Sequence, residues 1–535
     1  MRFVIYSLAL IYITVNAHRT TLTFGRPPEG FLGGADTVNY TWTDPKYMVY
    51  SNITQKVDHY FGNNDTWLQR YEYNSKFYDK TNGIVFLMLG GEGRLNDKWV
   101  RNENVSMMQW AAQHKAAAFQ LEHRFYGPRD YAPYNNQTAD ILQKYLTIDQ
   151  ALADIAAFII KMNELYFNGQ TTRWVTFGGS YPGSLSAFFR EKYPQLTIGA
   201  VSSSSAVHVF VDYYGYAVNT EKNYEGYSAA CGQRIRDGFK DMINLAYSGV
   251  AGRQQLKQTF NLCDDFNEQR ITKSVQFFFQ NVYGVFQGIN QYSGDNRSPA
   301  SDGLNIPEVC QILLNQTKTI TPMASIKAVW DYYNSFYGGN GCNDNSYAKF
   351  IQTYSDTSYP DDTDIVSTRS WIWQTCTELG YFQTTDGGNN GMFGSTVPVD
   401  FFVDQCIDLF GADYTLTQTY ISVHNVKTEF GAPEAYRGTN VVFPNGSLDP
   451  WKSLGLLSGF NNVDNAVDAF LINGTAHCAD MYPARAADLP SLVDGRARIK
   501  KNLDTWIDQA LKEKKSSTNM SILISVMAAT FFKFL

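Results

Sequence analysis

The hydrophobic pattern in the N-terminal half of the chain predicts short buried strands that alternate with amphipathic helices. Residues 84–89 and 116–121 are short apolar runs, and the first of them ends in glycines. Residues 148–162 carry apolar side chains at alternating spacings of four and three, the period of one helix face. A mostly apolar run, residues 174–177, then enters two glycines and a second helical pattern that stops at Pro194. This order of elements predicts a parallel sheet with crossover helices.

A capping signal marks the start of the first of these helices. Thr147 precedes the first apolar residue of the pattern, and Gln150 follows three positions later. A Thr and a Gln at this spacing form a capping box, in which each side chain bonds to the backbone N–H of the other residue. We therefore expect the helix to begin directly after Thr147.

The pattern changes between about residues 210 and 420, where strand–helix units give way to aromatic, Asn-rich and Gly-rich sequence with helical patches. Strand patterns return in residues 438–451 and 468–483. We interpret residues 210–420 as an insertion that caps a sheet resuming near residue 435. The predicted units are a signal peptide (1–17), a first part of the α/β domain with the nucleophile (18–209), an inserted helical lid (210–420), a second part with the acid and the histidine (421–512) and a C-terminal tail (513–535).

Both ends of the chain carry apolar segments. Residues 1–17 hold one basic residue, an apolar run and a Val-Asn-Ala ending, which is typical of a secretory signal peptide cleaved after Ala17. The tail is apolar from Met520 to Leu535, but 16 helical residues rise only about 24 Å, less than the roughly 30 Å hydrocarbon core of a bilayer. A weak C-terminal membrane anchor and an ordinary tail both remain open.

Composition and charge narrow the class of protein. The 535 residues are 44% hydrophobic and 18% charged, which is typical of a folded globular chain. The formal net charge is −7 and no block of basic residues occurs, so nothing favours nucleic-acid binding. Sequons agree with export, and the glycosylation candidates are Asn39, Asn52, Asn64, Asn104, Asn136 and Asn315.

The cysteines also favour an oxidising compartment. Six of the seven fall between residues 231 and 406, and Cys478 stands apart near the C-terminus. Spacing alone allows 15 pairings of six cysteines, so the sequence predicts up to three disulfides within the insertion without assigning them. The six candidates are Cys231, Cys263, Cys310, Cys342, Cys376 and Cys406.

Ser180 has the setting of a catalytic nucleophile. It follows Gly178 and Gly179 at the end of a predicted strand and precedes a predicted helix, as in the nucleophile elbow of hydrolases. The usual glycine two residues after the serine is replaced by Pro182, which the first turn of a helix tolerates because its missing N–H has no partner there. A serine in this position needs a base, an acid that orients the base, and oxyanion donors.

The remaining triad members follow from chain order. In this architecture the acid and the histidine come after the serine, each on a loop after a late strand. Of the seven histidines, only His477 follows a late strand-like run and a glycine. Asp449 has the same setting after the preceding strand-like run, whereas Asp464 and Asp468 lie before the histidine's strand. We therefore predict a Ser180, Asp449 and His477 triad.

Further groups complete or limit the predicted site. The oxyanion donors are expected to be the backbone N–H of Tyr181 and one from the loop after residues 84–89, either Gly91 or Glu92. The histidines are scattered and no phosphate-binding glycine loop with lysine occurs, so we predict no metal and no cofactor.

The chain resembles the prolylcarboxypeptidase family of serine exopeptidases. The matching stretches are "QKVDHYFGNNDTWLQRYEYN", "GGEG", "LEHRFYG", "LTIDQALADIAAFI", "FGGSYPGSLSAFFREKYP", "NGSLDPW" and "GTAHCADMYP", and together they span residues 55–483. The Pro in "GGSYPG" is most similar to the thymus-specific branch. The resemblance implies an α/β-hydrolase fold with a large, mostly helical, disulfide-bonded lid, and Ser180, Asp449 and His477 as nucleophile, acid and base. It also implies the pairs Cys231–Cys310, Cys263–Cys342 and Cys376–Cys406, with Cys478 unpaired.

These observations predict an exported serine peptidase that acts on peptide substrates near a chain terminus, next to proline, as a carboxypeptidase or a dipeptidyl-peptidase. Its destination is expected to be outside the cell or endolysosomal. An esterase or lipase of the same fold, and a non-catalytic binding protein, remain alternatives. The oligomeric state stays open, a homodimer included.

Overall fold

The computed structural model describes residues 40–293, 303–315, 317, 320–336, 341–388, 391–431, 433–460, 462 and 464–531, with the backbone alone for 363 and 513–531. The predicted signal peptide and the sequon at Asn39 lie outside these residues.

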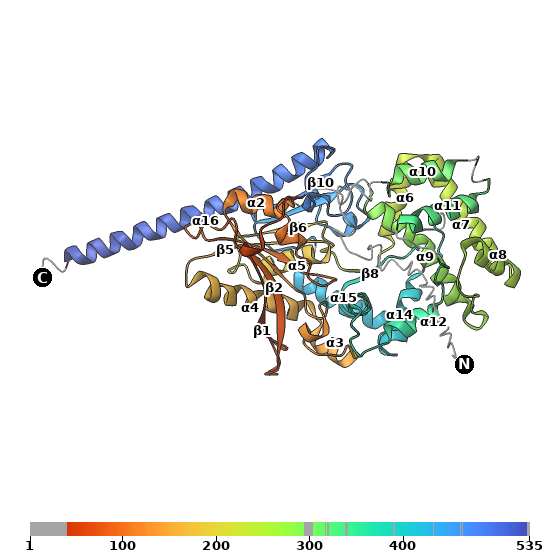
Figure 1. Cartoon of the computed structure of the whole chain (residues 1–535), viewed down its shortest axis with the longest axis horizontal. Coiled ribbons are helices and arrows are strands. Elements are labelled where there is room, and N and C mark those ends of the chain that lie inside the picture. The colour runs from red at the N-terminus through yellow and green to blue at the C-terminus, as the bar shows by residue number, and fades with distance from the viewer. Residues whose placement is uncertain are drawn as a thin grey trace, which may run out of the picture.

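An eight-stranded sheet forms the centre of the molecule (Figure 1), in the order β1-β2-β4-β3-β5-β6-β9-β10. β1 pairs with β2 and β2 with β4 in antiparallel register, whereas every pair from β4 to β10 is parallel. The strands are β1 (Met48–Lys56), β2 (Thr66–Asn74), β3 (Ile84–Leu89), β4 (Ala117–Leu121), β5 (Arg173–Gly179), β6 (Gly199–Ser203), β9 (Val441–Gly446) and β10 (Val467–Ile472). This order, with a sharp turn after β5, is the α/β-hydrolase fold.

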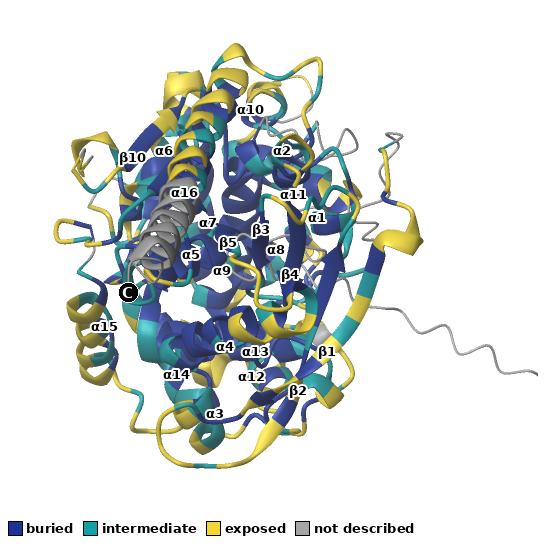
Figure 2. Cartoon of the chain, turned by 90° about the vertical axis from the view of Figure 1, so that its left-hand side faces the viewer, coloured by how far each residue is buried: buried dark blue, intermediate teal, exposed yellow. Residues whose placement is uncertain are grey.

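The side chains of β3 alternate between two hydrophobic cores, because helices cover both faces of the sheet. Val85, Leu87 and Leu89 pack into one core with α4 (Ile148–Phe167) and α5 (Tyr181–Lys192). The intervening residues of β3 pack into a second core with α2 (Ser106–His114) and α16 (Pro490–Phe531). Successive strand side chains point to opposite faces, so a strand covered by helices on both sides is apolar at every position. Figure 2 shows β3 and β4 buried, whereas the edge strand β1 carries exposed positions.

The elements that the hydrophobic pattern predicted are present. β3 covers residues 84–89, β4 begins one residue later than expected, and α5 ends at Lys192 with Tyr193 as its C-cap. The prediction of a parallel sheet is right for β4, β3, β5, β6, β9 and β10 and incomplete for the antiparallel strands β1 and β2. β1 is an edge strand with one half-exposed face, so its sequence lacks a continuous apolar run.

The predicted capping box is half right. The Thr147 side chain accepts a hydrogen bond from Gln150 N (3.2 Å), and α4 begins at Ile148. The Gln150 side chain does not return the bond to Thr147. It lies between Asp58 Oδ1 (2.9 Å) and His59 N (3.0 Å), because β1's following loop packs against this end of α4.

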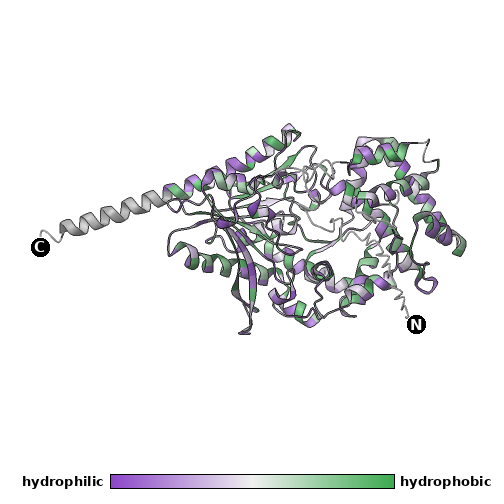
Figure 3. Ribbon diagram, in the orientation of Figure 1, coloured by the Kyte–Doolittle hydropathy of each residue, from purple (hydrophilic) through white to green (hydrophobic). Residues whose placement is uncertain are grey.

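The chain between β6 and β9 adds a mostly helical segment beside the sheet (Figure 1). Its elements are β7 (Phe210–Asp212), α6 (Gly215–Tyr227), α7 (Ala229–Tyr247), α8 (Val250–Phe260), α9 (Ile271–Gln291), α10 (Ile306–Leu314), α11 (Pro322–Phe336), α12 (Tyr347–Tyr354), α13 (Thr363–Gln374), a π-helical turn (Thr375–Leu379), β8 (Gly380–Phe382), α14 (Val399–Phe410) and α15 (Leu416–Phe430). Figure 3 shows hydrophobic and hydrophilic positions mixed along these helices. In α7, for example, Cys231, Ile235, Phe239, Met242 and Ala246 form one buried face, as expected for amphipathic helices that pack on one another.

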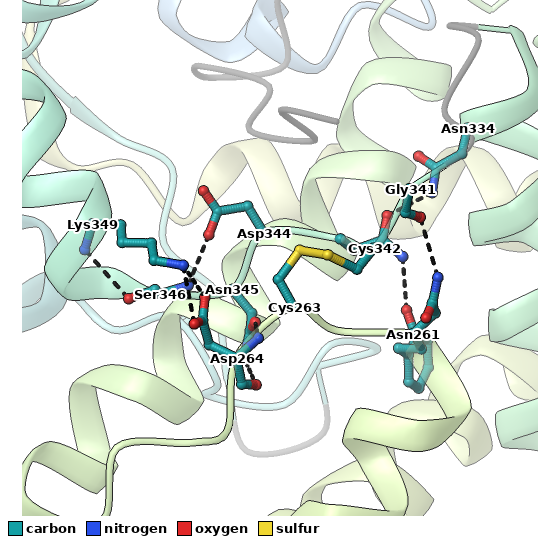
Figure 4. Close-up of a disulfide and its surroundings, with 12 residues drawn as sticks. Asn261, Cys263, Asp264, Asn334, Gly341, Cys342, Asp344, Asn345, Ser346 and Lys349 are labelled. Carbon is teal, nitrogen blue, oxygen red and sulfur yellow. Dashed lines mark hydrogen bonds and ion pairs between the residues drawn. A yellow bond between two sulfur atoms is a disulfide. The ribbon is translucent and has the colours of Figure 1, made fainter. Parts of the chain in front are cut away.

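Three disulfides join elements of the inserted segment. They are Cys231–Cys310, Cys263–Cys342 and Cys376–Cys406, the pairs that the family resemblance implied, and Cys478 is a buried free thiol. Figure 4 shows the second of them, where Asn261 Nδ2 donates to Gly341 O (3.1 Å) and Lys349 pairs with Asp264 (2.7 Å). Disulfides that close long loops restrict the unfolded chain and so stabilise the folded one.

The C-terminal helix α16 continues through the expected start of the tail at residue 513. No helix among the described residues is long and apolar enough to cross a membrane. The membrane anchor considered from the sequence would lie within residues 513–535, whose side chains are outside the described part of the chain. Of the described sequons, Asn52, Asn64 and Asn315 are exposed, while Asn104 and Asn136 are partly exposed, and their glycosylation stays a prediction.

Candidate active site

Ser180 sits on a strained turn between β5 and α5. Its φ of 62° and ψ of −133° are unusual for a residue with a side chain, and such a conformation costs on the order of 1–3 kcal/mol. The turn is held from both sides, because Ser180 N donates to Ser203 O (2.9 Å) and Ser184 N donates to Ser180 O (3.1 Å). Ser180 is partly exposed, although the ten residues of α5 that follow it are buried.

Close approach explains the two glycines before the serine. A Cβ on Gly178 would overlap the backbone carbonyl of Pro182, as expected if the helix passes over the strand end. A Cβ on Gly179 would overlap Met481 Sδ and would lie 2.9 Å from Cys478 Sγ. The residue before Ser180 therefore touches the residue after His477.

Asp449 and His477 form a hydrogen-bonded pair on neighbouring loops. Asp449 follows β9 and His477 follows β10, and these two strands are parallel neighbours in the sheet. His477 Nδ1 lies 2.8 Å from Asp449 Oδ2, and both side chains are 0% exposed. The other carboxylate oxygen, Asp449 Oδ1, accepts a hydrogen bond from Trp451 N (2.9 Å). With Nδ1 held by the carboxylate, Nε2 is the nitrogen of His477 that can accept a proton.

A run of serines at the end of β6 links the turn at Ser180, which we call the nucleophile turn after its predicted role, to the loop that carries His477, which we call the histidine loop. Ser203 O accepts from Ser180 N, and Ser203 Oγ donates to Asp480 Oδ2 (2.6 Å). Ser204 Oγ accepts from Cys478 N (2.9 Å). β6 lies between β5 and β9, so Ser203, through its carbonyl and its hydroxyl, joins the loops that follow β5 and β10, two strands that are not adjacent. Sequence reasoning missed them, although four consecutive serines at a strand end were a visible signal.

The electrostatics of the pair favour the protonated imidazole. Burial alone would lower the pKa of His477, but the charge of Asp449, together with the hydrogen bond to Asp449 and the contact with Cys478, outweighs burial, so the pKa lies well above its ordinary value. Burial raises the pKa of the neighbouring Asp480 carboxyl to about 6 and also raises the pKa of the Cys478 thiol. Cys478 is therefore a neutral thiol at neutral pH, and Asp449 supplies the charge that matters most for His477.

The loop after β3 packs against the first turn of α5. A Cβ on Gly91 would overlap the Pro182 ring, so this loop lies directly beside the nucleophile turn. The N–H of Gly90 donates to Leu121 O (2.9 Å), and the N–H of Gly93 donates to Gly91 O (2.8 Å). The amides of Gly91 and Glu92 lie between these fixed ends, and their role as oxyanion donors, like that of Tyr181, remains a prediction.

Buried polar side chains bond to the hydroxyl of Tyr181. Its hydroxyl lies 3.1 Å from His123 Nε2 and accepts a hydrogen bond from Gln374 Nε2 (2.9 Å). Burial lowers the pKa of His123 to about 4, so this ring is neutral at neutral pH. Burial raises the pKa of Glu378 to about 8, and this carboxyl accepts a hydrogen bond from Ile148 N (2.8 Å). The inserted segment thus contacts both the nucleophile turn and the start of α4.

The described residues contain no candidate metal site. Within the described part of the chain, no group of three or more His, Cys, Asp or Glu side chains could hold a metal ion.

Comparisons with known proteins show which family the chain matches. Residues 55–499 match the family description serine carboxypeptidase S28. A Caenorhabditis elegans protein named as a serine protease is 39% identical over 482 residues, which cover 89% of this chain and 87% of that protein. Thymus-specific serine protease of Mus musculus is 29% identical and covers 84% of this chain and 85% of its own length. Lysosomal Pro-X carboxypeptidase of Pongo abelii is 26% identical, with 94% and 97% covered.

The contact between Gly179 and the histidine loop can be tested by substitution. Gly179→Ala places a Cβ against Cys478 and Met481 and should push His477 away from Ser180. A displacement of about 1 Å at a catalytic group costs on the order of 10²-fold in rate. We expect the rate at which a fluorophosphonate probe labels Ser180 to fall by that order, and Met481→Ala in the same chain to restore part of it.

Gly226→Ala is the matched control, because a Cβ there meets nothing within 4 Å. It should leave the labelling rate unchanged. Equal labelling of the Gly179→Ala and Gly226→Ala proteins would contradict the close approach.

Proposed function

The chain belongs to the serine carboxypeptidase S28 family, and from this premise we propose that it is a serine exopeptidase with Ser180 as nucleophile, His477 as base and Asp449 as orienting acid. The buried hydrogen bond between Asp449 and His477 is the observation that carries this proposal. Titratable groups that are desolvated and paired with a specific charge cluster at functional sites, which makes this pair a candidate for the base and its orienting acid. The contact of Gly179 with Cys478 supports placing this pair beside Ser180.

The proposed reaction begins when Ser180 Oγ attacks the peptide carbonyl carbon and His477 Nε2 takes the hydroxyl proton. Asp449 stabilises the imidazolium that forms and holds its orientation. The negative charge on the carbonyl oxygen is met by the N–H of Tyr181 and that of Gly91 or Glu92. His477 then gives its proton to the leaving amine, the C–N bond breaks, and an ester to Ser180 remains. Water, activated by the same base, hydrolyses the ester and releases the second product.

The inserted segment supports action at a chain terminus. We propose a division into the α/β domain (residues 18–209 and 421–512) and a lid (210–420) that admits only the end of a peptide. The relatives include a Pro-X carboxypeptidase, which supports cleavage next to proline. Peptides blocked at one end or the other identify the terminus that the site admits.

We further propose that the protein works in the secretory pathway, either outside the cell or in an endolysosomal compartment. The three disulfides support an oxidising compartment during folding. The lysosomal relative supports the endolysosomal destination.

The proposed function is tested by probe labelling together with peptide digestion. Wild type should react with a fluorophosphonate probe and should shorten peptides that have free termini. Ser180→Ala should abolish both activities, and His477→Ala should lower both by several orders of magnitude. Mass spectrometry of peptides blocked at the N-terminus, the C-terminus or both should show that doubly blocked peptides resist wild type and should identify the required end.

Ser186→Ala is a control on the same helix, since Ser186 Oγ donates to Thr176 Oγ1 (2.9 Å) within the core. It should keep both activities. Probe labelling that persists in Ser180→Ala would place the nucleophile elsewhere, and cleavage of short-chain esters without cleavage of peptides would favour an esterase.

The pH dependence of kcat/KM tests the role of Asp449. His477 must be neutral to act as a base, and Asp449 raises its pKa, so activity should fall as pH drops through a midpoint above the ordinary histidine value of 6.5. Asp449→Asn removes the charge but not the burial, so the midpoint should move to lower pH. The substitution should also lower kcat by about 10⁴-fold because the histidine loses its orientation.

Asp468→Asn provides the comparison, because Asp468 is the rival acid in the sequence and forms a partly exposed ion pair with Arg498. Its kcat and its acidic midpoint should match wild type. A normal profile for Asp449→Asn, with an altered one for Asp468→Asn, would reverse the assignment.

A further inference from the structure

Gln291 is the last residue of α9, and it lies where the inserted segment meets the catalytic loops. α9 is buried along most of its length among the helices of this segment (Figure 1), and Gln291 itself is only 3% exposed. The backbone carbonyl of Gln291 accepts a hydrogen bond from His477 N (2.9 Å). The backbone N–H of the histidine is therefore bonded to the inserted segment.

The side chain of Gln291 reaches the other catalytic loop. Its Oε1 accepts hydrogen bonds from Trp451 Nε1 (3.0 Å) and from the Tyr216 hydroxyl (2.7 Å). The indole N–H is only a donor, so the amide oxygen of Gln291 must face it. The amide nitrogen then donates to the Tyr292 hydroxyl (3.0 Å), whose ring centroid lies 6.1 Å from that of His477.

Trp451 links Gln291 to Asp449. Its backbone N–H donates to Asp449 Oδ1 (2.9 Å), while its indole is held by Gln291. Gln291 is therefore linked to Asp449 through two hydrogen bonds, by way of Trp451. The backbone carbonyl of Gln291 is also bonded to His477 N. The same loop is also held at Pro450 O, which accepts from Asn219 Nδ2 (2.9 Å) and from the Tyr213 hydroxyl (2.7 Å).

We propose that Gln291 is a positioning residue that fixes the distance between Asp449 and His477, so that the inserted segment completes the catalytic pair as well as covering it. This inference rests on the catalytic roles proposed above. Without the side-chain amide of Gln291, the indole of Trp451 loses its anchor while His477 N stays bonded to the Gln291 carbonyl. The loops of Asp449 and His477 are then no longer held by the same residue, and the Asp449–His477 hydrogen bond lengthens.

Gln287 offers a matched control one turn earlier in the same helix. It is also a buried glutamine, but its amide bonds to Gln383 (2.5 Å), a residue of the inserted segment, and not to a catalytic loop. A general loss of packing or hydrogen bonding in α9 would affect Gln287→Leu and Gln291→Leu alike. A specific role of Gln291 in catalysis would lower the kcat of Gln291→Leu and leave the kcat of Gln287→Leu unchanged.

The test compares steady-state kinetics and pH profiles of the full-length chain with Gln291→Leu, Gln291→Glu and Gln287→Leu. We expect Gln291→Leu to lower kcat on the order of 10²-fold with KM changed little, and to move the acidic midpoint of kcat/KM to lower pH because His477 loses part of its contact with Asp449. Asp480, Cys478 and Tyr292 also face His477, but none of them is changed. Gln291→Glu keeps both acceptor contacts and should retain more activity, with the midpoint at or above that of wild type.

Gln287→Leu should lower the melting temperature about as much as Gln291→Leu while keeping the kcat and the midpoint of wild type. Equal kinetics for the two leucine variants would overturn the inference. If Gln291→Leu does not fold, Trp451→Phe removes the same hydrogen bond from the other side and should move the midpoint in the same direction; an unchanged midpoint there would also overturn it. An inactive wild type, or an active Ser180→Ala protein, would instead refute the proposed function.

Discussion

A hydrogen bond between two side chains with no exposure to solvent, Asp449 and His477, constrains the rest of this structure. Removing a carboxylate and an imidazole from water is costly, and the cost is offset only when both are held in good geometry with their remaining polar atoms bonded. The parallel strands β9 and β10 bring the two loops together, and Trp451 N bonds to the second oxygen of Asp449. The sheet thus brings Asp449 and His477 together, and the inserted segment packs against their loops.

The neighbouring features follow from bringing Ser180 to that pair. The strained backbone at Ser180 and the absence of a side chain at Gly179 allow the nucleophile turn to meet the Cys478 end of the histidine loop. Ser203, at the end of the intervening strand β6, bonds to Ser180 N and to Asp480, and the next residue, Ser204, bonds to Cys478 N, so these two serines keep that distance fixed. Backbone strain of this kind persists only where the surroundings hold the turn in place. The inserted segment adds Gln291, which bonds to Trp451, and Gln374, which bonds to Tyr181, so it contacts the site at two places.

Much of this could be predicted from the sequence, because strand ends in a parallel sheet are marked by local signals. The apolar run before Gly178, the capping threonine of α4 and the position of His477 after a late strand each depend on neighbouring residues. The hairpin of β1 and β2 could not be found in this way, since its half-exposed strands lack a continuous apolar run. The roles of Gln291 and Gln374 were equally hidden, because a buried glutamine acquires its partners only when segments distant in sequence pack together. The disulfide pairs came from family resemblance and not from spacing, which left 15 choices open.

The most direct measurement is a crystal structure of the full chain after reaction with a fluorophosphonate. We expect phosphorus bonded to Ser180 Oγ, with one phosphonyl oxygen about 2.7–3.1 Å from the amide nitrogens of Tyr181 and of Gly91 or Glu92. His477 Nε2 should lie within hydrogen-bonding distance of the serine oxygen, and Nδ1 should remain bonded to Asp449. An adduct on another residue, or a Ser180 adduct with the imidazole of His477 held away from it, would contradict the assignment of these three side chains to one catalytic site.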